Sequence, residues 1–250
     1  MKNIFFLLLT LSVSNIIAQT NADLFRKANN AYKETNYQDA INLYKQIEQQ
    51  DLVSSSLFYN LGNGYYKLND VANTIYYYEK ALLLNPLNKD AKTNLEFAKR
   101  MVIDTIEELP KTFLQRIEAT YLQKISYNQW AIIAVFFSFL TALLFLLFYF
   151  SNHSGKKRSY FLFSLLALLL FVFSTTITYS QYHTSVTTTF AIIFSPKVSV
   201  KNAPTNNADE VFILHEGTKI NVLDAVDDWK KIRLADGKIG WVLAKVLKEL

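Results

Sequence analysis

Hydrophobic and polar positions follow different periods in different parts of the chain. Residues 22–103 place apolar and aromatic side chains at helical spacing, and two long uncharged runs follow at 130–150 and 160–179. Over residues 190–250, apolar residues alternate with polar ones, as they do in half-buried strands. The pattern therefore predicts a multidomain chain with an all-α region, two transmembrane helices and a C-terminal all-β barrel.

A short apolar run precedes these regions, and residues 1–18 have the layout of a secretory signal peptide. Lys2 gives a positive start, and Ala18 offers a small residue for cleavage. The apolar run between them is too short to span a bilayer comfortably. We therefore expect the residues that follow to be exported. An uncleaved anchor is the alternative, and it has the same consequence.

Residues 22–103 contain two segments, about 22–53 and 55–88, that can be laid over each other, and a third helical segment at 90–103. The second segment resembles the tetratricopeptide repeat family. The residues that stand at that family's spacing are Leu61, Gly62, Tyr65, Tyr78, Ala81 and Pro86. In this motif the small residues let paired helices approach, and the proline ends the second helix.

The resemblance predicts an all-α tetratricopeptide solenoid of two repeats, with residues 90–103 as a capping helix. The match is incomplete, because Val71 and Thr74 replace the usual tyrosine and alanine, and the first copy lacks the terminal proline. A generic helical bundle is the alternative. Arrays of this kind usually need about three repeats for stability, so a short array favours added packing from a partner or from the next helix.

The resemblance also implies a groove that holds peptides and is lined by the first helix of each pair. The expected lining residues are Asn29, Lys33, Tyr59, Asn63, Tyr66 and Lys67. A clamp for a C-terminal carboxylate is not predicted, because Phe25, Asp90 and Asn94 occupy the places of its basic residues. For each lining residue taken singly, a solvated or packing role is the alternative.

Residues 104–128 separate the helical region from the first uncharged run. The segment from Asp104 to Pro110 is polar and ends in proline, which is typical of a linker. After it, apolar residues recur at helical spacing with charged residues between them. This spacing predicts an amphipathic helix that either lies at the membrane surface or packs on the repeats.

The uncharged runs at 130–150 and 160–179 are each long enough to cross about 30 Å of hydrocarbon. A buried hairpin of a soluble core is the alternative. The loop between them, residues 151–159, holds basic residues but no acidic one, which favours the cytoplasm. Together with the signal peptide, this loop predicts a multi-pass protein of a bacterial inner membrane, with both soluble regions on the periplasmic side.

Residues 190–250 form short alternating stretches separated by turns, which predicts a small antiparallel barrel. The order of their apolar, glycine and tryptophan residues resembles the bacterial SH3-like family. The residues that carry this resemblance are Val198, Val200, Lys201, Pro204, Gly217, Thr218, Val222, Trp229, Ile232, Asp236, Gly237, Gly240, Trp241 and Val242. Members of that family often bind cell-wall peptides or protein segments. Trp229 and Trp241 are therefore candidate contact residues, with simple packing as the alternative.

Composition and charge argue against several classes of function. The net charge is +5, and no stretch rich in Lys and Arg carries interleaved aromatic residues, so nucleic-acid binding is not predicted. The chain has no cysteine and three histidines, none with a second ligand at metal spacing. It has no motif for a nucleophile or a phosphate-binding glycine loop. We therefore predict no catalytic, cofactor-binding or metal-binding residue and no enzymatic activity.

The complete order of parts resembles the BatE-like proteins of the Bat family, which is named for an aerotolerance operon. That order is a signal peptide, tetratricopeptide repeats, a linker ending at Pro110, two membrane spans and a terminal SH3-like domain. The resemblance implies partners among other Bat proteins, some with von Willebrand A domains, in oxygen or stress tolerance. We expect a membrane-anchored scaffold. A cell-wall sensor or anchor, with possible peptidoglycan contact, and a regulator of an envelope hydrolase are the alternatives.

Overall fold

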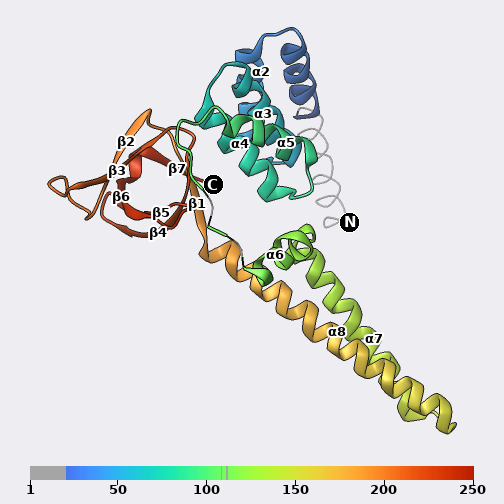
Figure 1. Ribbon diagram of the computed structural model, residues 1–250. Coiled ribbons are helices and arrows are strands. Elements are labelled where there is room, and N and C mark those ends of the chain that lie inside the picture. The colour runs from blue at the N-terminus through green and yellow to red at the C-terminus, as the bar shows by residue number, and fades with distance from the viewer. Residues whose placement is uncertain (1–20, 108, 111) are drawn as a thin grey trace, which may run out of the picture. The chain divides into compact units, whose positions relative to one another are not determined.

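The computed structural model describes residues 21–250 apart from residues 108 and 111 (Figure 1). The predicted signal peptide, residues 1–18, lies outside the described residues. The predictions of a helical N-terminal region, two apolar helices and a C-terminal antiparallel sheet are confirmed.

The chain divides into two compact units. The first unit joins the residues up to Leu109 with Phe190–Leu250, and the second unit is Pro110–Thr189. Segments that precede and follow the two apolar helices in the sequence therefore pack together in the first unit.

The helical region of the first unit begins with a helix over residues 21–33. The helices that follow are α2 (Tyr37–Glu48), α3 (Ser55–Lys67), α4 (Val71–Leu84) and α5 (Lys89–Lys99). From α2 to α5, each helix packs on the next one, and the connections between them are short. Neighbouring helices therefore run in opposite directions, as paired helices joined by short loops do.

Local sequence signals explain where these helices begin and turn. The side chains of Ser54, Asp70 and Asn88 each accept a hydrogen bond from a backbone N–H in the first turn of α3, α4 and α5. Each bond satisfies a donor that the helix itself leaves open. After α2 and α3, Asp51 and Asn69 adopt positive φ angles of 56° and 59°, which Asp and Asn tolerate better than most residues. The chain can therefore reverse within a few residues.

Tyrosines and small residues dominate the core between the helices. Tyr44, Tyr77 and Tyr78 are almost fully buried, and Tyr65 stacks on Tyr77 with 5.5 Å between the ring centroids. A Cβ atom at Gly62 would lie 2.5 Å from the Tyr78 ring. The close approach of α3 and α4 therefore depends on a residue without a side chain at position 62.

The C-terminal region of the first unit forms a seven-stranded sheet of antiparallel pairs. Its strands are β1 (Thr189–Ile193), β2 (Lys197–Lys201), β3 (Glu210–His215), β4 (Lys219–Val226), β5 (Trp229–Arg233), β6 (Ile239–Leu243) and β7 (Leu247–Glu249). Their order across the sheet is β3-β2-β6-β5-β4-β1-β7. The buried side chains of this region are Ala191, Ile193, Val198, Val200, Leu214, Ile220, Ile232, Leu234 and Val242.

The alternation of polar and apolar residues did not predict strand β1. Its central residues are buried on both faces, because Ala191 and Ile193 join the core of the sheet while Ile192 joins the core of the helical region. A strand that is covered on both faces has no polar side to alternate with an apolar one. β1 therefore belongs to both cores and ties the two regions together.

The segment after α5, which we predicted as a linker, lies along the sheet. One carboxylate oxygen of Asp104 accepts hydrogen bonds from the backbone N–H of His215 (2.7 Å) and the hydroxyl of Thr218 (2.6 Å), and the other lies 2.7 Å from Nδ1 of His215. Further along, the N–H of Leu109 donates to the carbonyl of Ala235 at 3.2 Å. The polar side chain of Asp104 is used for contacts to residues more than 100 positions away in the sequence. The local composition of the segment does not reveal such distant contacts.

Side chains of the helical region and the sheet also interlock around α4. The ammonium of Lys219 lies 2.7 Å from the Glu79 carboxylate, and the rings of Tyr76 and Phe194 meet edge to face at 5.8 Å. Gly217 has a φ angle of 85°, and a Cβ atom there would approach a methyl group of Val71 to 2.9 Å. This turn therefore requires glycine both for its backbone conformation and for its closeness to the helices.

The second unit consists mainly of two long apolar helices, α7 (Tyr127–Phe150) and α8 (Ser154–Thr187), that pack along each other. Among the described residues, these are the helices long and apolar enough to cross a membrane. Most of their large apolar side chains are exposed, whereas small residues such as Ser164, Ala167 and Ser174 are buried. Small residues at a contact let transmembrane helices approach closely.

A short helix, α6 (Phe113–Thr120), and a turn of 3-10 helix, η1 (Leu122–Lys124), precede α7. Capping boxes begin α6 and α7, with Thr112 and Ser126 as the respective N-cap residues. These caps satisfy backbone donors at the first turn of each helix. The predicted amphipathic segment thus contains a helix with its own start signal.

The second apolar helix is longer than predicted at both ends. The expected loop 151–159 is helical from Ser154 onward, because lysine and arginine are good helix formers and do not interrupt the backbone ladder. The other end lies at Thr187 instead of residue 179. There the hydroxyls of Thr184 and Thr187 donate to carbonyls four residues earlier, at 3.0 and 2.7 Å. This polar segment remains helical because its hydroxyl groups hydrogen-bond to carbonyls of the preceding turn.

Replacing Asp104 with asparagine should lower the free energy of unfolding by about 1–3 kcal/mol at pH 7, because donors of His215 and Thr218 lose a charged acceptor. Burial alone would raise the pKa of Asp104, but hydrogen bonds from His215 and Thr218 outweigh burial and hold the pKa below its usual value. The stabilisation is therefore complete above the unfolded-state pKa of about 3.9. It is lost as the pH falls through the lower folded-state pKa.

Thermal unfolding of the full chain in detergent micelles, followed by circular dichroism from pH 7 down to about pH 2, measures this effect. Glu107→Gln removes an exposed carboxylate from the same segment and serves as the control. The difference between the wild type and Asp104→Asn should shrink at the acidic end, whereas a constant difference across the range would contradict this role of the Asp104 charge.

Candidate functional site

The helical region contains a pocket with a volume of about 250 Å³. Its walls are aromatic and amide side chains with one lysine at the edge. The lining residues are Tyr32, Tyr59, Asn63, Tyr66, Lys67, Tyr78, Asn94 and Phe97. Four of the six predicted groove residues are therefore brought together here, namely Tyr59, Asn63, Tyr66 and Lys67.

A hydrogen-bonded triad of side chains forms one wall of the pocket. The amide oxygen of Asn63 on α3 accepts hydrogen bonds from the hydroxyl of Tyr78 on α4 (2.7 Å) and from the amide nitrogen of Asn94 on α5 (3.0 Å). Both bonds reach the same oxygen, so they fix the orientation of the Asn63 side chain. The amide nitrogen of Asn63 has no hydrogen-bond acceptor among the described residues.

The same triad occurs one helix pair earlier. The amide oxygen of Asn29 accepts hydrogen bonds from the hydroxyl of Tyr44 (2.5 Å) and the amide nitrogen of Asn60 (3.1 Å). Each residue of the second triad follows its counterpart by 34 positions, from 29 to 63, from 44 to 78 and from 60 to 94. The helical region is therefore duplicated in its polar contacts as well as in its helices.

The tyrosines of both triads stay protonated far above physiological pH, because burial raises pKa values that are ordinarily about 10. Burial raises the pKa of Tyr44 to about 12, with a smaller opposing effect of the hydrogen bond from Asn60. Burial also raises the pKa of Tyr78, against a smaller effect of the hydrogen bond from Asn94. Each hydroxyl therefore remains a donor and holds its asparagine in one orientation.

The triads leave a specific set of polar groups for a ligand. In each one, the amide nitrogen of the first asparagine (Asn29 or Asn63) and the amide oxygen of the second (Asn60 or Asn94) have no partner among the described residues. A free amide donor beside a free amide acceptor matches the C=O and N–H groups of an extended polypeptide backbone. The flanking tyrosines add apolar contact area at little cost in side-chain entropy.

The remaining predicted groove residues lie outside the pocket lining. Asn29 belongs to the first triad, and Lys33 is exposed on the same helix. The predicted groove did not include Tyr32, Tyr78, Asn94 and Phe97, which line the pocket. Tyr78 was assigned only to the repeat motif, and Asn94 only to the place of a clamp residue. The 34-residue spacing between Asn60 and Asn94 is a signal that would have identified Asn94.

The two predicted tryptophans share one face of the sheet. In the pairing of β5 with β6, Trp229 lies opposite Leu243 and Lys231 lies opposite Trp241, while the next residue, Ile232, is fully buried on the other face. Both tryptophans are half-buried, and the Lys231 ammonium lies 5.8 Å from the centre of the Trp241 ring. This face therefore offers a second surface on which an aromatic contact is possible.

No group of three or more His, Asp or Glu side chains that could hold a metal ion occurs among the described residues. His215 instead holds Asp104, as described above. His153 precedes α8 and His183 lies within that helix.

Comparison with known proteins identifies one family within the chain. The model of the bacterial SH3 domain matches residues 196–248, which include β2 to β6 and most of β7. β1 lies outside this match and is added to it in the structure. No curated protein matches the chain. The SH3-like prediction is therefore confirmed for the C-terminal sheet.

Replacing Tyr78 with phenylalanine should lower the free energy of unfolding by about 1 kcal/mol, because the ring still packs but Asn63 loses a hydrogen bond. Tyr44→Phe should have a similar effect, since Tyr44 has the same role in the first triad. Tyr66→Phe is the matched control, because Tyr66 is partly exposed and has no hydrogen bond to a described residue. Thermal unfolding measured by circular dichroism should rank the first two variants below the third. Equal stability of all three would contradict the triads.

Proposed function

We propose that the protein is a non-enzymatic, membrane-anchored adaptor that binds an extended segment of a partner protein on its helical region. The observation that carries this proposal is the duplicated triad beside the pocket. Two oriented donor and acceptor pairs, one repeat apart, suit a backbone that runs along the array. The lysine at the pocket edge, Lys67, adds a preference for a partner segment with a nearby acidic group.

The duplication also supports a tetratricopeptide identity for the helical region. Antiparallel helix pairs with a 34-residue period are characteristic of that family. The second pair carries the small and aromatic residues at the expected positions, and Gly62 packs directly on Tyr78. The array is short for a family that usually has about three repeats. Contacts from the sheet, including those of Phe194 and Ile192, supply part of the missing packing.

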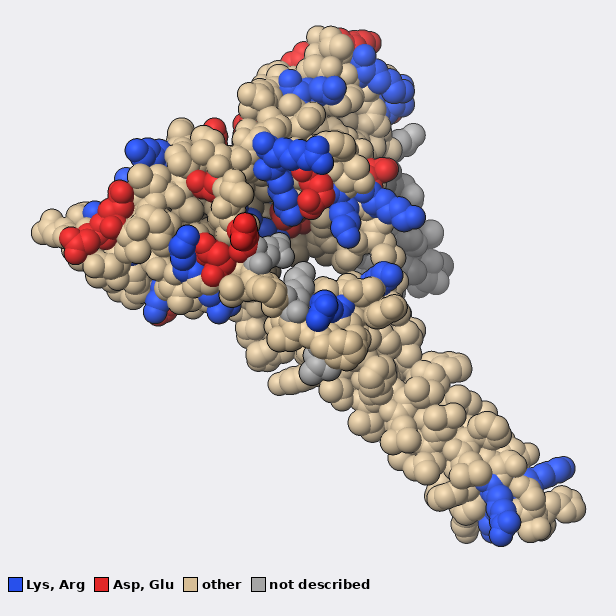
Figure 2. All heavy atoms as spheres, in the orientation of Figure 1, with Lys and Arg blue, Asp and Glu red and all other residues tan. Residues whose placement is uncertain are grey.

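The membrane topology is part of the proposal. The residues up to Leu109 and those from Phe190 onward pack in one unit, which supports a hairpin in which α7 crosses the bilayer and α8 returns. At the end of the hairpin where α7 meets α8, the face in Figure 2 carries Lys and Arg but no Asp or Glu, which favours the cytoplasm. With an export signal at residues 1–18, both soluble regions would be periplasmic and anchored in the inner membrane.

The order of parts further supports a role in an envelope complex with other Bat proteins in oxygen or stress tolerance. This part of the proposal rests on the resemblance of the whole arrangement and on no single residue. A scaffold is consistent with it, because the proposed binding surfaces lie in the first unit and the apolar helices contain no charged residue between 130 and 150.

Cell-wall binding is the second candidate function. Bacterial SH3 domains often bind peptidoglycan or proteins, and the match to that family favours this reading. The face with Trp229 and Trp241 is the surface on which a wall peptide would lie. Control of an envelope hydrolase in another chain is compatible with either surface.

A triple variant, Asn63→Ala with Tyr66→Ala and Lys67→Glu, should reduce recovery of the partner in a mild-detergent pull-down by about tenfold or more. It removes the oriented donor, an aromatic wall and the pocket charge. Mass spectrometry of the recovered proteins measures the loss. Circular dichroism and membrane fractionation check that the variant is folded and inserted.

The control for this experiment changes similar residue types away from the pocket. It combines Asn42→Ala and Gln46→Ala on α2 with Lys197→Glu on β2, all exposed residues. Full recovery by the triple variant, with loss of wall pelleting in Trp229→Ala and Trp241→Ala, would favour the anchor over the adaptor. Loss of the complex only when α7 and α8 are replaced by an unrelated hairpin would place the partner contact in the bilayer.

The topology predicts which residues an impermeant thiol reagent can reach in intact spheroplasts. The native chain has no cysteine, so single substitutions report unambiguously. Asn36→Cys and Asn207→Cys, both at exposed positions, should react with an impermeant maleimide, and Ser154→Cys should react only after lysis. Labelling of Ser154→Cys alone in intact cells would reverse the orientation.

A further inference from the structure

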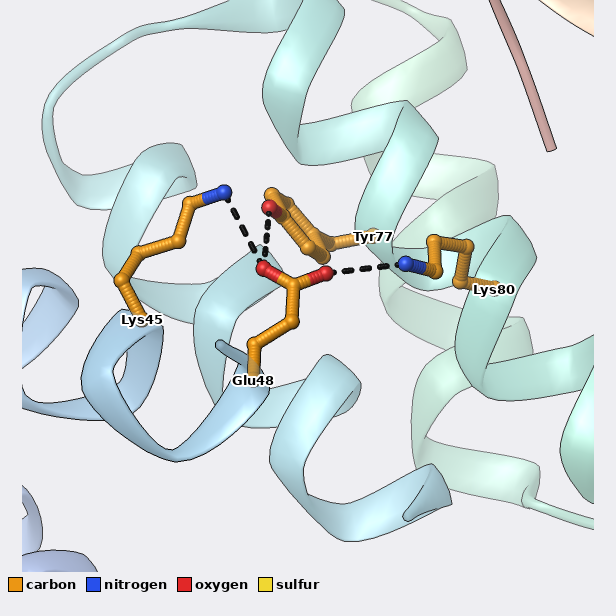
Figure 3. Close-up of polar contacts among 4 residues, drawn as sticks. All are labelled: Lys45, Glu48, Tyr77 and Lys80. Atoms are coloured by element: carbon orange, nitrogen blue, oxygen red, sulfur yellow. Dashed lines mark hydrogen bonds and ion pairs between the residues drawn. The ribbon is translucent and has the colours of Figure 1, made fainter. Parts of the chain in front are cut away.

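A cluster of charged residues lies in the first unit, and none of its members belongs to the pocket lining. Glu48 at the end of α2 accepts contacts from Lys45 (3.0 Å) and Lys80 (2.9 Å), and the hydroxyl of Tyr77 donates to the same carboxylate at 3.0 Å. Figure 3 shows the two lysines reaching the carboxylate from opposite sides, with the Tyr77 hydroxyl between them. One carboxylate is therefore shared by two cations.

The sheet adds a third cation to this cluster. The ammonium of Lys248 on β7 lies 4.2 Å from the centre of the Tyr76 ring. The ammonium nitrogens of Lys45, Lys80 and Lys248 lie 5.1, 5.7 and 5.9 Å from the centre of the Tyr77 ring. Three positive charges therefore surround one aromatic ring, with a single negative charge among them.

Neighbouring carboxylates do not neutralise Lys248. Glu79 on α4 is paired with Lys219 (2.7 Å), and Glu249 on β7 is paired with Lys230 (2.9 Å). Among the described residues, the Lys248 ammonium lies near the rings of Tyr76, Tyr77 and Phe194 and forms no ion pair or hydrogen bond. Its ammonium keeps its hydrogen-bond donors free, and the residue is exposed enough for a ligand to reach it.

The local field confirms that the cluster has an excess of positive charge. Partial desolvation beside the rings lowers the pKa of Lys248, and the charges of Lys45 and Lys80 lower it further against the opposing effect of Glu48. Burial alone would raise the pKa of Glu48, but its hydrogen bonds and ion pairs with Lys80 and Lys45 outweigh burial and lower it. The carboxylate is therefore already fully engaged, and Lys248 is repelled more than it is attracted.

We propose that Lys45, Lys80 and Lys248 form a binding site for a phosphate group at the junction of α2, α4 and β7. The ligand would be held by the free donors of Lys248 and by donors that Lys45 and Lys80 do not use on Glu48. The shared chemistry of the ligand is a compact phosphate, either free or as the headgroup of a lipid.

The residue types favour phosphate over a carboxylate. The cluster contains lysines and no arginine, so it lacks the planar pair of donors that binds a carboxylate side-on. Lysine acts as a point charge, and the three ammonium nitrogens, each within 5.9 Å of the centre of the Tyr77 ring, can contact different oxygens of a phosphate. Free phosphate can carry a second negative charge, so it balances the excess of two positive charges better than a single carboxylate does. A lipid phosphodiester carries a single negative charge, so this charge argument applies to free phosphate alone.

The test is a calorimetric titration of the full chain, in micelles of an uncharged detergent, with inorganic phosphate at constant ionic strength. Lys248→Gln should weaken phosphate binding about fivefold to tenfold. Lys197→Gln removes an exposed lysine of the same sheet and should leave binding unchanged. In a second arm, micelles contain a short-chain phosphatidylglycerol or, as control, phosphatidylcholine.

Two results support the proposal and separate the sources of phosphate. Binding of inorganic phosphate that is lost in Lys248→Gln supports a site for free phosphate, and binding only of phosphatidylglycerol with the same loss supports a lipid headgroup. Glu48→Gln keeps a hydrogen-bond acceptor but removes the opposing charge, so it should tighten binding severalfold even if it lowers the melting temperature. Absence of binding in both arms, equal binding by Lys248→Gln and Lys197→Gln, or no tightening by Glu48→Gln would overturn the proposal.

Discussion

The contact between Asp104 and the turn before β4 is the constraint on which the architecture of the first unit depends. The half-buried carboxylate of Asp104 meets His215 and Thr218 at distances of 2.6 to 2.7 Å, across 111 and 114 positions of sequence. Nearly all of that separation is taken up by α6, α7, α8 and the start of the sheet. Residues 110–189 therefore interrupt one compact unit in the sequence, and the chain rejoins that unit at Phe190.

In the helical region, hydrogen bonds from buried tyrosines orient the side chains of the proposed binding surface. Tyr44 and Tyr78 are buried for packing, yet their hydroxyls still need partners, and each finds the oxygen of an asparagine on the preceding helix. That requirement fixes the asparagine oxygen and leaves its amide nitrogen without an acceptor among the described residues. A ligand that meets such groups does not have to order them, which reduces the entropic cost of binding. The proposed binding face is thus a consequence of the hydrogen bonds that the buried tyrosine hydroxyls make.

Much of this could be predicted from sequence, because it is encoded in local periods. Helical spacing located the paired helices, and alternation located β2 to β5. The SH3-like resemblance covered β6, and the repeat resemblance placed Tyr59, Asn63 and Tyr66 in one groove. Features set by distant contacts escaped prediction. β1 has no polar face, Asp104 looks like any linker residue, and Asn94 gains its role only from Asn63. The length of α8 was also underestimated. Its last turns are rich in hydroxyl side chains, which donate hydrogen bonds to backbone carbonyls of the same helix and so do not end it.

The lysine cluster depends on the same long-range packing, because two of its cations come from the helices and the third from β7. Lys45 and Lys80 share the single carboxylate of Glu48, and the docking of the sheet places Lys248 beside a pair that already has an excess of positive charge. The aromatic rings attract the Lys248 ammonium, but the other two lysines repel it, and a bound anion would offset that repulsion. A phosphate bound by all three lysines exists only when the helices and the sheet are together. By linkage it would stabilise that arrangement by a free energy that grows with the logarithm of the phosphate concentration once the site is largely occupied. The same interface that orders the unit would then be strengthened by its ligand.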